Sequence, residues 1–204
     1  MRWPGCPPAG HGAPMRAEDV ENAVTVLVGA LGTVPDDGWS APAGPLDWSC
    51  RDTVVHVADD LFGYAAQVAL APPDDYPPFE IVVPGGVGTA GLLQVVATGG
   101  AMLAAAVRTA PAGVRGWHPY GDADAAGFAA MGVAEVLVHT HDITRATEPA
   151  WALPAAPCRD VLARLWPDVD AGDDPAGALL HHTGRASWRG VPAPVRWRWY
   201  GAPR

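Results

Sequence analysis

The stretch that most constrains the fold is 123–147, because it is apolar on nearly every side of a helix. The aliphatic residues that cover most of its faces are Val133, Val136, Leu137 and Val138. A helix that is apolar all round is buried among other helices. Glu135 and His139 differ in azimuth by only about 40° on such a helix, so they point the same way. The chain must therefore fold around a helix that carries a carboxylate and an imidazole.

Two interpretations of Glu135 and His139 follow from their spacing. Burying a carboxylate and an imidazole costs several kcal/mol unless a partner compensates for the lost hydration. A bound metal ion is one such partner. Alternatively, the two side chains form a hydrogen bond with each other on a partly exposed helix. The spacing alone favours this second interpretation, because E-x-x-x-H is frequent by chance. His141 lies about 200° from His139 and is not expected to share a metal with it, whereas Asp142 lies near the right face.

Three further stretches carry apolar residues at helical spacing. They span about residues 16–34, 50–71 and 89–109. A cap signal, Ser49 followed by Asp52, precedes the second stretch. In the third, the pair Gly99-Gly100 predicts close packing or a bend. The fold class is therefore all-α, with an antiparallel four-helix bundle over residues 15–147, an architecture that builds metal sites from facing helices.

His56 lies off the apolar stripe of its predicted helix. It shares another stripe with Asp52, Asp59, Asp60, Gly63 and Gln67. On an ordinary surface helix this stripe faces solvent, and His56 is then an exposed histidine. On the functional interpretation it lines a pocket, where an aspartate orients the imidazole. His56, Glu135 and His139 would then hold one divalent metal, with zinc as the expected ion, and leave positions open for substrate.

The ends of the chain differ in composition from the bundle. Residues 1–14 contain four prolines and three glycines, and we expect a disordered tail there, since Met15 could equally open the protein. Residues 148–204 form a short C-terminal extension. We expect short helices over 158–166 and 175–182 in it, and then a short strand or an extended tail over 195–199.

Composition limits the partners and the compartment. The net charge of −9 argues against nucleic acid, and the one patch of Arg196 and Arg198 interleaved with tryptophans is too short to change that. An odd number of cysteines without C-x-x-C spacing favours a reduced cytoplasm. The most apolar run, 87–107, is broken by glycines and Gln94, so no membrane span is expected. We expect a cytoplasmic monomer or homodimer.

Two motifs resemble a known family. The first is W-S-x-x-D-x-x-x-H, from Trp48 to His56, within the segment 45–61. The second is E-x-x-x-H-x-x-D, from Glu135 to Asp142. Together they resemble the DinB-like superfamily, and within it the N-terminal domain family of the actinobacterial mycothiol-dependent maleylpyruvate isomerase. The resemblance covers roughly residues 16–147.

The resemblance implies a DinB-like bundle whose metal is held by His56, Glu135 and His139. It also implies the low-molecular-weight thiol mycothiol, bound as thiolate and added to a small electrophilic substrate. In the isomerase the addition permits rotation about a double bond, whereas in related transferases the thiol stays attached. Two alternatives stay open: a thiol-independent, metal-assisted isomerase, cyclase or hydrolase of a biosynthetic pathway, and a non-catalytic small-molecule-binding protein.

Some further residues are candidates around this site. Arg185 and Asp142 are the candidate catalytic residues. Arg185 suits a substrate carboxylate, which it could bind through a bidentate contact. The simpler interpretation is that Arg185 is a surface arginine. The aromatic candidates for thiol binding at the mouth of the site are Tyr64, Trp117 and Tyr120, beside His118; an aromatic turn that packs on the bundle is equally expected.

The loop tryptophans and the C-terminal part carry further expectations. Trp39 and Trp48 are expected to pack their loop onto the bundle, and Cys50 is expected to be structural. The family's isomerase is expected to carry a larger C-terminal α/β domain than the roughly 55 residues left here. That difference puts the maleylpyruvate substrate in doubt more than it does the metal.

Overall fold

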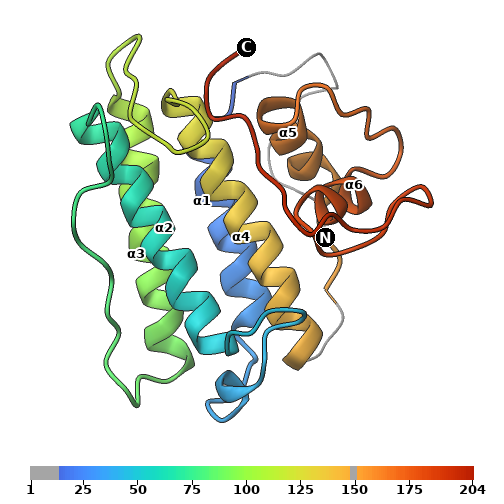
Figure 1. Ribbon diagram of the computed structural model, residues 1–204. Coiled ribbons are helices and arrows are strands. Elements are labelled where there is room, and N and C mark those ends of the chain that lie inside the picture. The colour runs from blue at the N-terminus through green and yellow to red at the C-terminus, as the bar shows by residue number, and fades with distance from the viewer. Residues whose placement is uncertain (1–13, 148–150) are drawn as a thin grey trace.

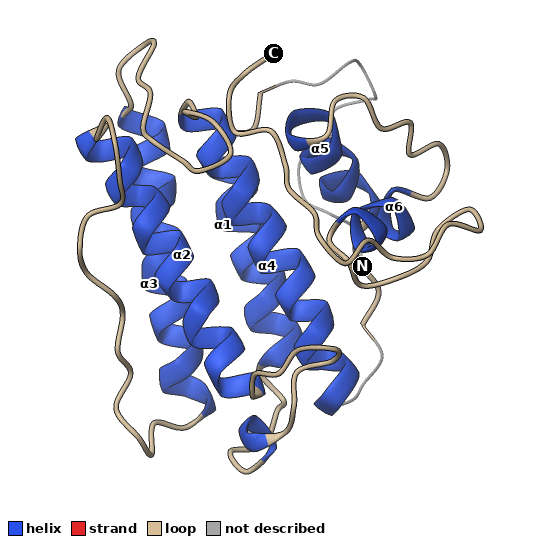
Figure 2. Cartoon of the chain, in the orientation of Figure 1, coloured by secondary structure: helices blue, strands red, loops and turns tan. Residues whose placement is uncertain are grey.

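The computed structural model describes residues 14–147 and 151–204, and its regular elements there are all helical (Figure 2). Four long helices form a bundle (Figure 1): α1 (Ala17–Leu31), α2 (Cys50–Leu70), α3 (Thr89–Thr109) and α4 (Ala125–Thr147). The shorter elements are the 3-10 helix η1 (Gly38–Ser40), α5 (Ala155–Leu165) and α6 (Pro175–His182). The predicted all-α bundle is confirmed. The predicted tail over 1–14 lies outside the described residues, except for Pro14.

The helix bounds follow the local sequence signals. Ser49 caps α2, since its hydroxyl accepts the Asp52 amide at 3.1 Å and donates to the Asp52 carboxylate at 2.6 Å. Asp124 accepts the amide of Gly127 at 2.8 Å, and α4 therefore begins at Ala125, two residues after the predicted start.

Helix α4 lies at the centre of the molecule. It contacts α1, α2 and α3 on the bundle side and α5 on the other side (Figure 1). Sixteen of its 23 residues are buried, which confirms the burial predicted from its apolar faces. This position places any polar side chain of α4 inside the molecule.

The pair Gly99-Gly100 marks close packing. A Cβ at Gly99 would lie 2.9 Å from the carbonyl oxygen of Ala58 on α2 and 3.2 Å from the Cβ of Leu61. At Gly100 it would lie 2.6 Å from a methyl group of Val24 on α1. The glycines thus let α3 approach both neighbouring helices.

We expect Gly99→Ala to destabilise the protein by about 1–3 kcal/mol, because overpacking against the backbone forces the helices apart. Gly29→Ala is the matched control. Nothing lies within 4 Å of its added Cβ, so helix propensity should stabilise this variant by up to about 1 kcal/mol. Urea unfolding measures both. Equal effects of the two substitutions would contradict the close-packing account.

Helix α3 also has the length and composition of a membrane span, with a mean hydropathy of 1.7 over its most apolar window. That window is 39 % buried in the structure. The helix packs against α1 and α2 through its glycines, and its exposed side carries Gln94 and Thr98. A core helix of a bundle passes the same test of length and composition, so the test does not identify a membrane protein.

The C-terminal part packs on α4 through α5, with α6 behind it (Figure 1). Arg164 of α5 holds the end of the chain: it donates to the carbonyl oxygens of Tyr200 and Gly201 and to the carboxylate of Asp124. The predicted strand over 195–199 is wrong, because no described segment pairs with it. The alternative expectation, an extended tail on the surface, describes this segment.

Candidate metal centre

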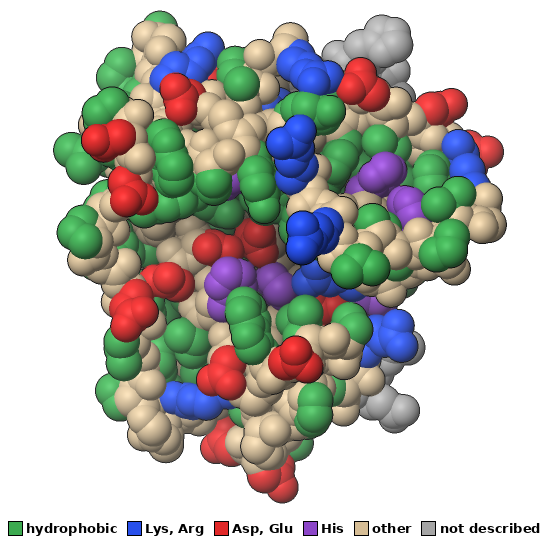
Figure 3. Space-filling view, viewed as in Figure 1, with side chains coloured by type: hydrophobic (Ala, Val, Ile, Leu, Met, Phe, Trp, Pro, Cys, Tyr) green, Lys and Arg blue, Asp and Glu red, His purple; other side chains and the backbone are tan. Residues whose placement is uncertain are grey.

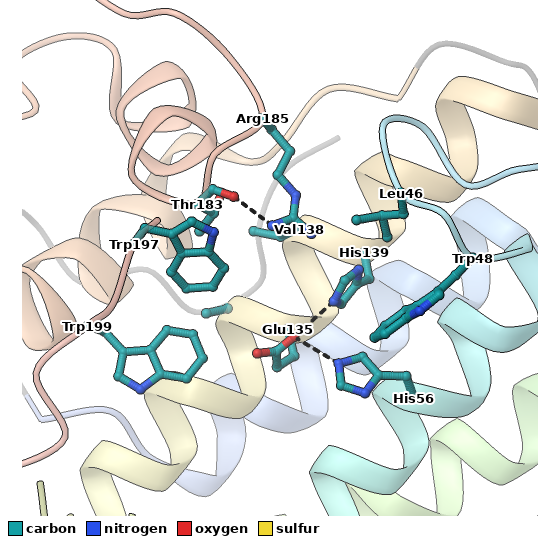
Figure 4. Close-up of a pocket in the computed structure, with 11 residues that line it drawn as sticks. Leu46, Trp48, His56, Glu135, Val138, His139, Thr183, Arg185, Trp197 and Trp199 are labelled. Atoms are coloured by element: carbon teal, nitrogen blue, oxygen red, sulfur yellow. Dashed lines mark hydrogen bonds and ion pairs between the residues drawn. The ribbon is translucent and has the colours of Figure 1, made fainter. Parts of the chain in front are cut away.

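Three side chains from two helices meet at the predicted site. The ligand atoms of His56 on α2 and of Glu135 and His139 on α4 lie within 4.8 Å of one another (Figure 4). One Glu135 oxygen is 3.1 Å from His139 Nε2 and 3.8 Å from His56 Nε2. Within the described ranges this is the one group of histidine, cysteine and carboxylate side chains with the geometry to hold a metal.

The pair on α4 is both hydrogen-bonded and buried. The side chains of Glu135 and His139 are 11 % and 7 % exposed. The alternative interpretation was a hydrogen-bonded pair on a partly exposed helix. The hydrogen bond is present, but the two side chains are not exposed. Burial raises the pKa of Glu135, but the hydrogen bond from His139 and the nearby charges outweigh it, and the pKa is lowered. Burial lowers the pKa of His56, which favours the neutral imidazole that a metal requires.

Asp142 orients His139 from behind. Its carboxylate is fully buried and lies 3.0 Å from His139 Nδ1, so Nδ1 donates to Asp142 while Nε2 is directed at Glu135. Burial lowers the pKa of His139, but Asp142 and Glu135 outweigh it and raise the pKa to about 9. A carboxylate behind a ligating histidine is the usual support of a metal site.

Arg185 binds Asp142. Its Nη2 and Nε donate to the two Asp142 oxygens at 2.9 and 3.4 Å, and its Nη1 donates to the Thr183 carbonyl at 2.7 Å. The side chain is 9 % exposed, so the interpretation as a surface arginine is wrong. The bidentate face that was expected to bind a substrate carboxylate is already occupied by Asp142.

The donor set fits a divalent ion such as zinc. Two imidazole nitrogens and one carboxylate oxygen are ligands that zinc accepts, and three protein ligands leave a coordination position for another molecule. The Asp142 carboxylate fixes the tautomer that exposes His139 Nε2 to the ion. These residues therefore could hold the metal; that they do so stays a prediction.

A cavity of about 310 Å³ opens at the three candidate ligands. Its other lining residues are Leu46, Trp48, Ala134, Val138, Thr183, Arg185, Trp197 and Trp199 (Figure 4). The wall is thus mostly apolar and aromatic, which suits a small organic ligand held beside a few polar groups. Of the stripe predicted on α2, His56 lines this cavity, whereas its other members lie outside the lining and Asp52 is exposed.

Trp48 is part of this wall. Its ring packs edge-on against His56 with 4.9 Å between the ring centroids, and 45 % of the residue is exposed. Trp48 therefore packs onto the bundle only in part, through His56 of α2. Trp39 does pack there: it is 3 % exposed and donates to Thr89 on α3. The two differ because Trp48 directly precedes the cap of α2 and so lies beside the first turns of that helix.

Asp60 approaches His56 differently from the expected orienting aspartate. Its carboxylate lies 3.1 Å from Nε2, the same nitrogen that faces Glu135. Burial, followed by the charge of Glu135, raises the pKa of Asp60 well above its usual value. Asp60 therefore shares the candidate ligand atom of His56 instead of holding the far side of the ring.

Sequence reasoning missed the residues that the C-terminal part brings to the site. Thr183, Trp197 and Trp199 come from beyond the bundle and complete the cavity opposite α4. The alternation of Arg and Trp over 196–199 was the available signal, since it places every second side chain on one face. Only the packing of α5 against α4, with α6 behind it, shows that this face is the pocket.

The three aromatic residues predicted to bind the thiol lie outside the lining of this cavity. Tyr64 is buried beside Phe128, with 5.8 Å between the ring centroids. Trp117 contacts Tyr76, and Tyr120 contacts Trp199. The equally expected alternative, an aromatic turn that packs on the bundle, describes Tyr64 and Trp117 well.

His118 lies at the centre of this aromatic cluster and predicts a pH dependence. Burial lowers its pKa to about 4. In the unfolded chain the imidazole takes up a proton near pH 6.5, so stability should fall as the pH drops from 6.5 to 4, by at most about 3 kcal/mol. His118→Asn keeps an acceptor for the Tyr120 amide and should flatten this part of the curve. Urea unfolding at several pH values checks it; parallel curves would contradict it.

The fold and the site define a class: helical bundles with a His–Glu–His cluster open to a cavity. A model of the mycothiol maleylpyruvate isomerase N-terminal domain family matches residues 20–144. The chain belongs to this family, and the predicted resemblance is confirmed. No curated protein matches the sequence.

Two solved structures share the fold. The crystal structure of the mycothiol-dependent maleylpyruvate isomerase is 18 % identical with a TM-score of 0.63. A histidine-to-alanine mutant of that isomerase is 17 % identical with a TM-score of 0.64. Each match covers 89 % of this chain and 95 % of the other. The match extends beyond the bundle into the C-terminal part of this chain; that the isomerase carries a larger C-terminal α/β domain stays a prediction. The DinB-like bundle is confirmed.

Proposed function

We propose that this protein is a metal-dependent enzyme that uses mycothiol to isomerise, or to transfer sulfur to, a small electrophile. The observation that carries the proposal is the convergence of His56, Glu135 and His139 on one cavity. The family match supports the use of mycothiol. The two solved structures of the same fold are named as mycothiol-dependent isomerases. The free thiols of Cys50 and Cys158 fit the cytoplasmic location that we also propose.

A bound zinc ion would act as a Lewis acid and favour the thiolate form of a coordinated thiol. The chain's own residues prepare its place. Asp142 keeps a proton of His139 on Nδ1. Burial raises the pKa of Asp142, but the hydrogen bonds from His139 and Arg185 outweigh it and lower the pKa, which keeps the carboxylate ionised. The tryptophans of the wall would limit the access of water to the reacting sulfur and carbon.

The proposed isomerisation proceeds by addition of the thiolate, rotation and elimination. The thiolate sulfur bonds to one alkene carbon of a substrate whose double bond is conjugated to a carbonyl, and the π electrons move to the carbonyl oxygen. Rotation about the resulting single bond precedes the return of these electrons, which expels the thiolate. In the transfer reaction the same adduct takes up a proton and keeps the sulfur.

Calorimetric titration with mycothiol tests the proposal. We expect one thiol per zinc-loaded protein, and at least tenfold weaker binding to metal-free protein or to His56→Ala, because the ion would hold the sulfur. Desthiol mycothiol, in which hydrogen replaces the SH group, is the matched ligand control. Equal affinity for the two ligands would support the thiol-independent alternative. Ligand uptake without turnover of any electrophile would support the non-catalytic alternative.

A further inference from the structure

The extended C-terminal segment turns tryptophans and arginines to different cavities. Trp197 and Trp199 line the cavity of the metal centre. Arg196 and Arg198 are exposed and line a second cavity of about 670 Å³. Its other lining residues are Tyr120, Val195 and Trp197. Trp197 belongs to both linings, so the two cavities adjoin across a single ring.

Arg196 and Arg198 have no counterion among the described residues. The chain carries a net charge of −9 and has 13 basic residues, all of them arginine. Arginines that bind carboxylates or carbonyl oxygens within the chain are Arg51, Arg108, Arg115, Arg164, Arg185 and Arg204. No hydrogen bond or ion pair joins Arg196 or Arg198 to the described part of the chain. Two like charges in the lining of one cavity repel each other, and an anion bound between them would offset this repulsion.

The metal-centre cavity offers no free cation to a ligand. Arg185 is the one arginine in its lining, and its bidentate face is occupied by Asp142. Arg196 and Arg198 line the adjoining cavity, on the other side of Trp197, and have no partner in the described chain. Figure 3 shows this asymmetry, with acidic and histidine side chains in the hollow of this face and basic side chains gathered along one side of it.

We propose that Arg196 and Arg198 bind the oxyanion, carboxylate or phosphate, of an elongated substrate whose reactive part lies at the metal centre. A guanidinium group matches two oxygens of such an anion at once, and two of them in the lining of one cavity can bind the same anion. Tyr120 supplies a hydroxyl and Trp197 an apolar face for the carbon chain between the two ends. The site lies outside residues 20–144, the part matched by the family model. The inference rests on the proposed function, since it names the substrate class of that site.

The test is a calorimetric titration of the zinc-loaded full chain with succinate, propyl phosphate and neutral succinamide. The variant is Arg196→Gln with Arg198→Gln. The matched control is Arg145→Gln with Arg159→Gln, which removes the same charge from two exposed arginines outside both cavities. We expect at least one of the anions to bind to the wild type and the control alike, at least tenfold more weakly to the variant, and succinamide not to bind. The anion that binds more tightly identifies the oxyanion.

The inference is overturned if neither anion binds to the wild type, or if the variant binds them as the wild type does. Zinc content and mycothiol binding are measured on the same preparations. A wild-type protein that binds neither zinc nor mycothiol overturns the proposed function. Normal zinc and mycothiol binding together with unchanged anion binding in the variant overturns only the oxyanion site. The two failures are therefore distinguishable.

Discussion

Replacing His139 by alanine is expected to weaken zinc binding by more than about a hundredfold. Structural zinc sites bind with about 10–16 kcal/mol over four ligands, so one ligand contributes about 3 kcal/mol. His139 is also the ligand with the most support, since Asp142 holds its Nδ1 and Glu135 lies 3.1 Å from its Nε2. Competition with a chromophoric chelator measures the affinity, and elemental analysis measures the bound metal.

His141→Ala is the matched control for this substitution. It removes an imidazole from the same helix two residues further on, and His141 is not part of the cavity lining. We expect it to bind one zinc per chain with unchanged affinity. Circular dichroism checks that each variant is folded. If His139→Ala fails to fold, His56→Ala tests the same site, because the side chain of His56 is 33 % exposed and its loss disturbs the core less. Full zinc content in a folded ligand variant would exclude the site.

Replacing Asp142 by alanine is expected to destabilise the metal-free protein by about 3–5 kcal/mol, because it leaves a buried charge without its partner. Asp142 is fully buried, and Arg185 is 9 % exposed. The guanidinium group would lose both of its bonds to the carboxylate while it stays in the wall. Zinc affinity should fall as well, by about 10–100-fold, since His139 loses the group that fixes its tautomer.

Two comparisons separate these effects. Arg108→Ala breaks an exposed ion pair with Glu21, in which both side chains are 48 % exposed, and should cost less than about 1 kcal/mol. The double variant Asp142→Ala with Arg185→Met removes both buried charges and should recover much of the stability but not the zinc affinity. Urea unfolding without metal gives the first quantity and chelator competition the second. A double variant that regains full zinc affinity would exclude the positioning role of Asp142.

Much of the helical framework could be predicted from local patterns. The four long helices begin and end within a few residues of the predicted bounds, because apolar period and caps such as Ser49 act over one or two turns. The common direction of Glu135 and His139 is equally local, since it depends only on the pitch of one helix. Close packing at Gly99 was one of two predicted outcomes, and only the position of the neighbouring helix shows it.

The sequence by itself determined that a carboxylate and an imidazole enter the core on one helix, and that His56 lies off the apolar stripe of another. Only the tertiary structure decided what these side chains meet. Asp142 and Arg185 are 43 residues apart, and their bond depends on how the C-terminal part packs against α4. The same packing turns Trp197 toward the cavity and Arg196 away from it. The physical reason is that the direction of a side chain on its own element is a local property, whereas the surface it faces is set by contacts between distant segments.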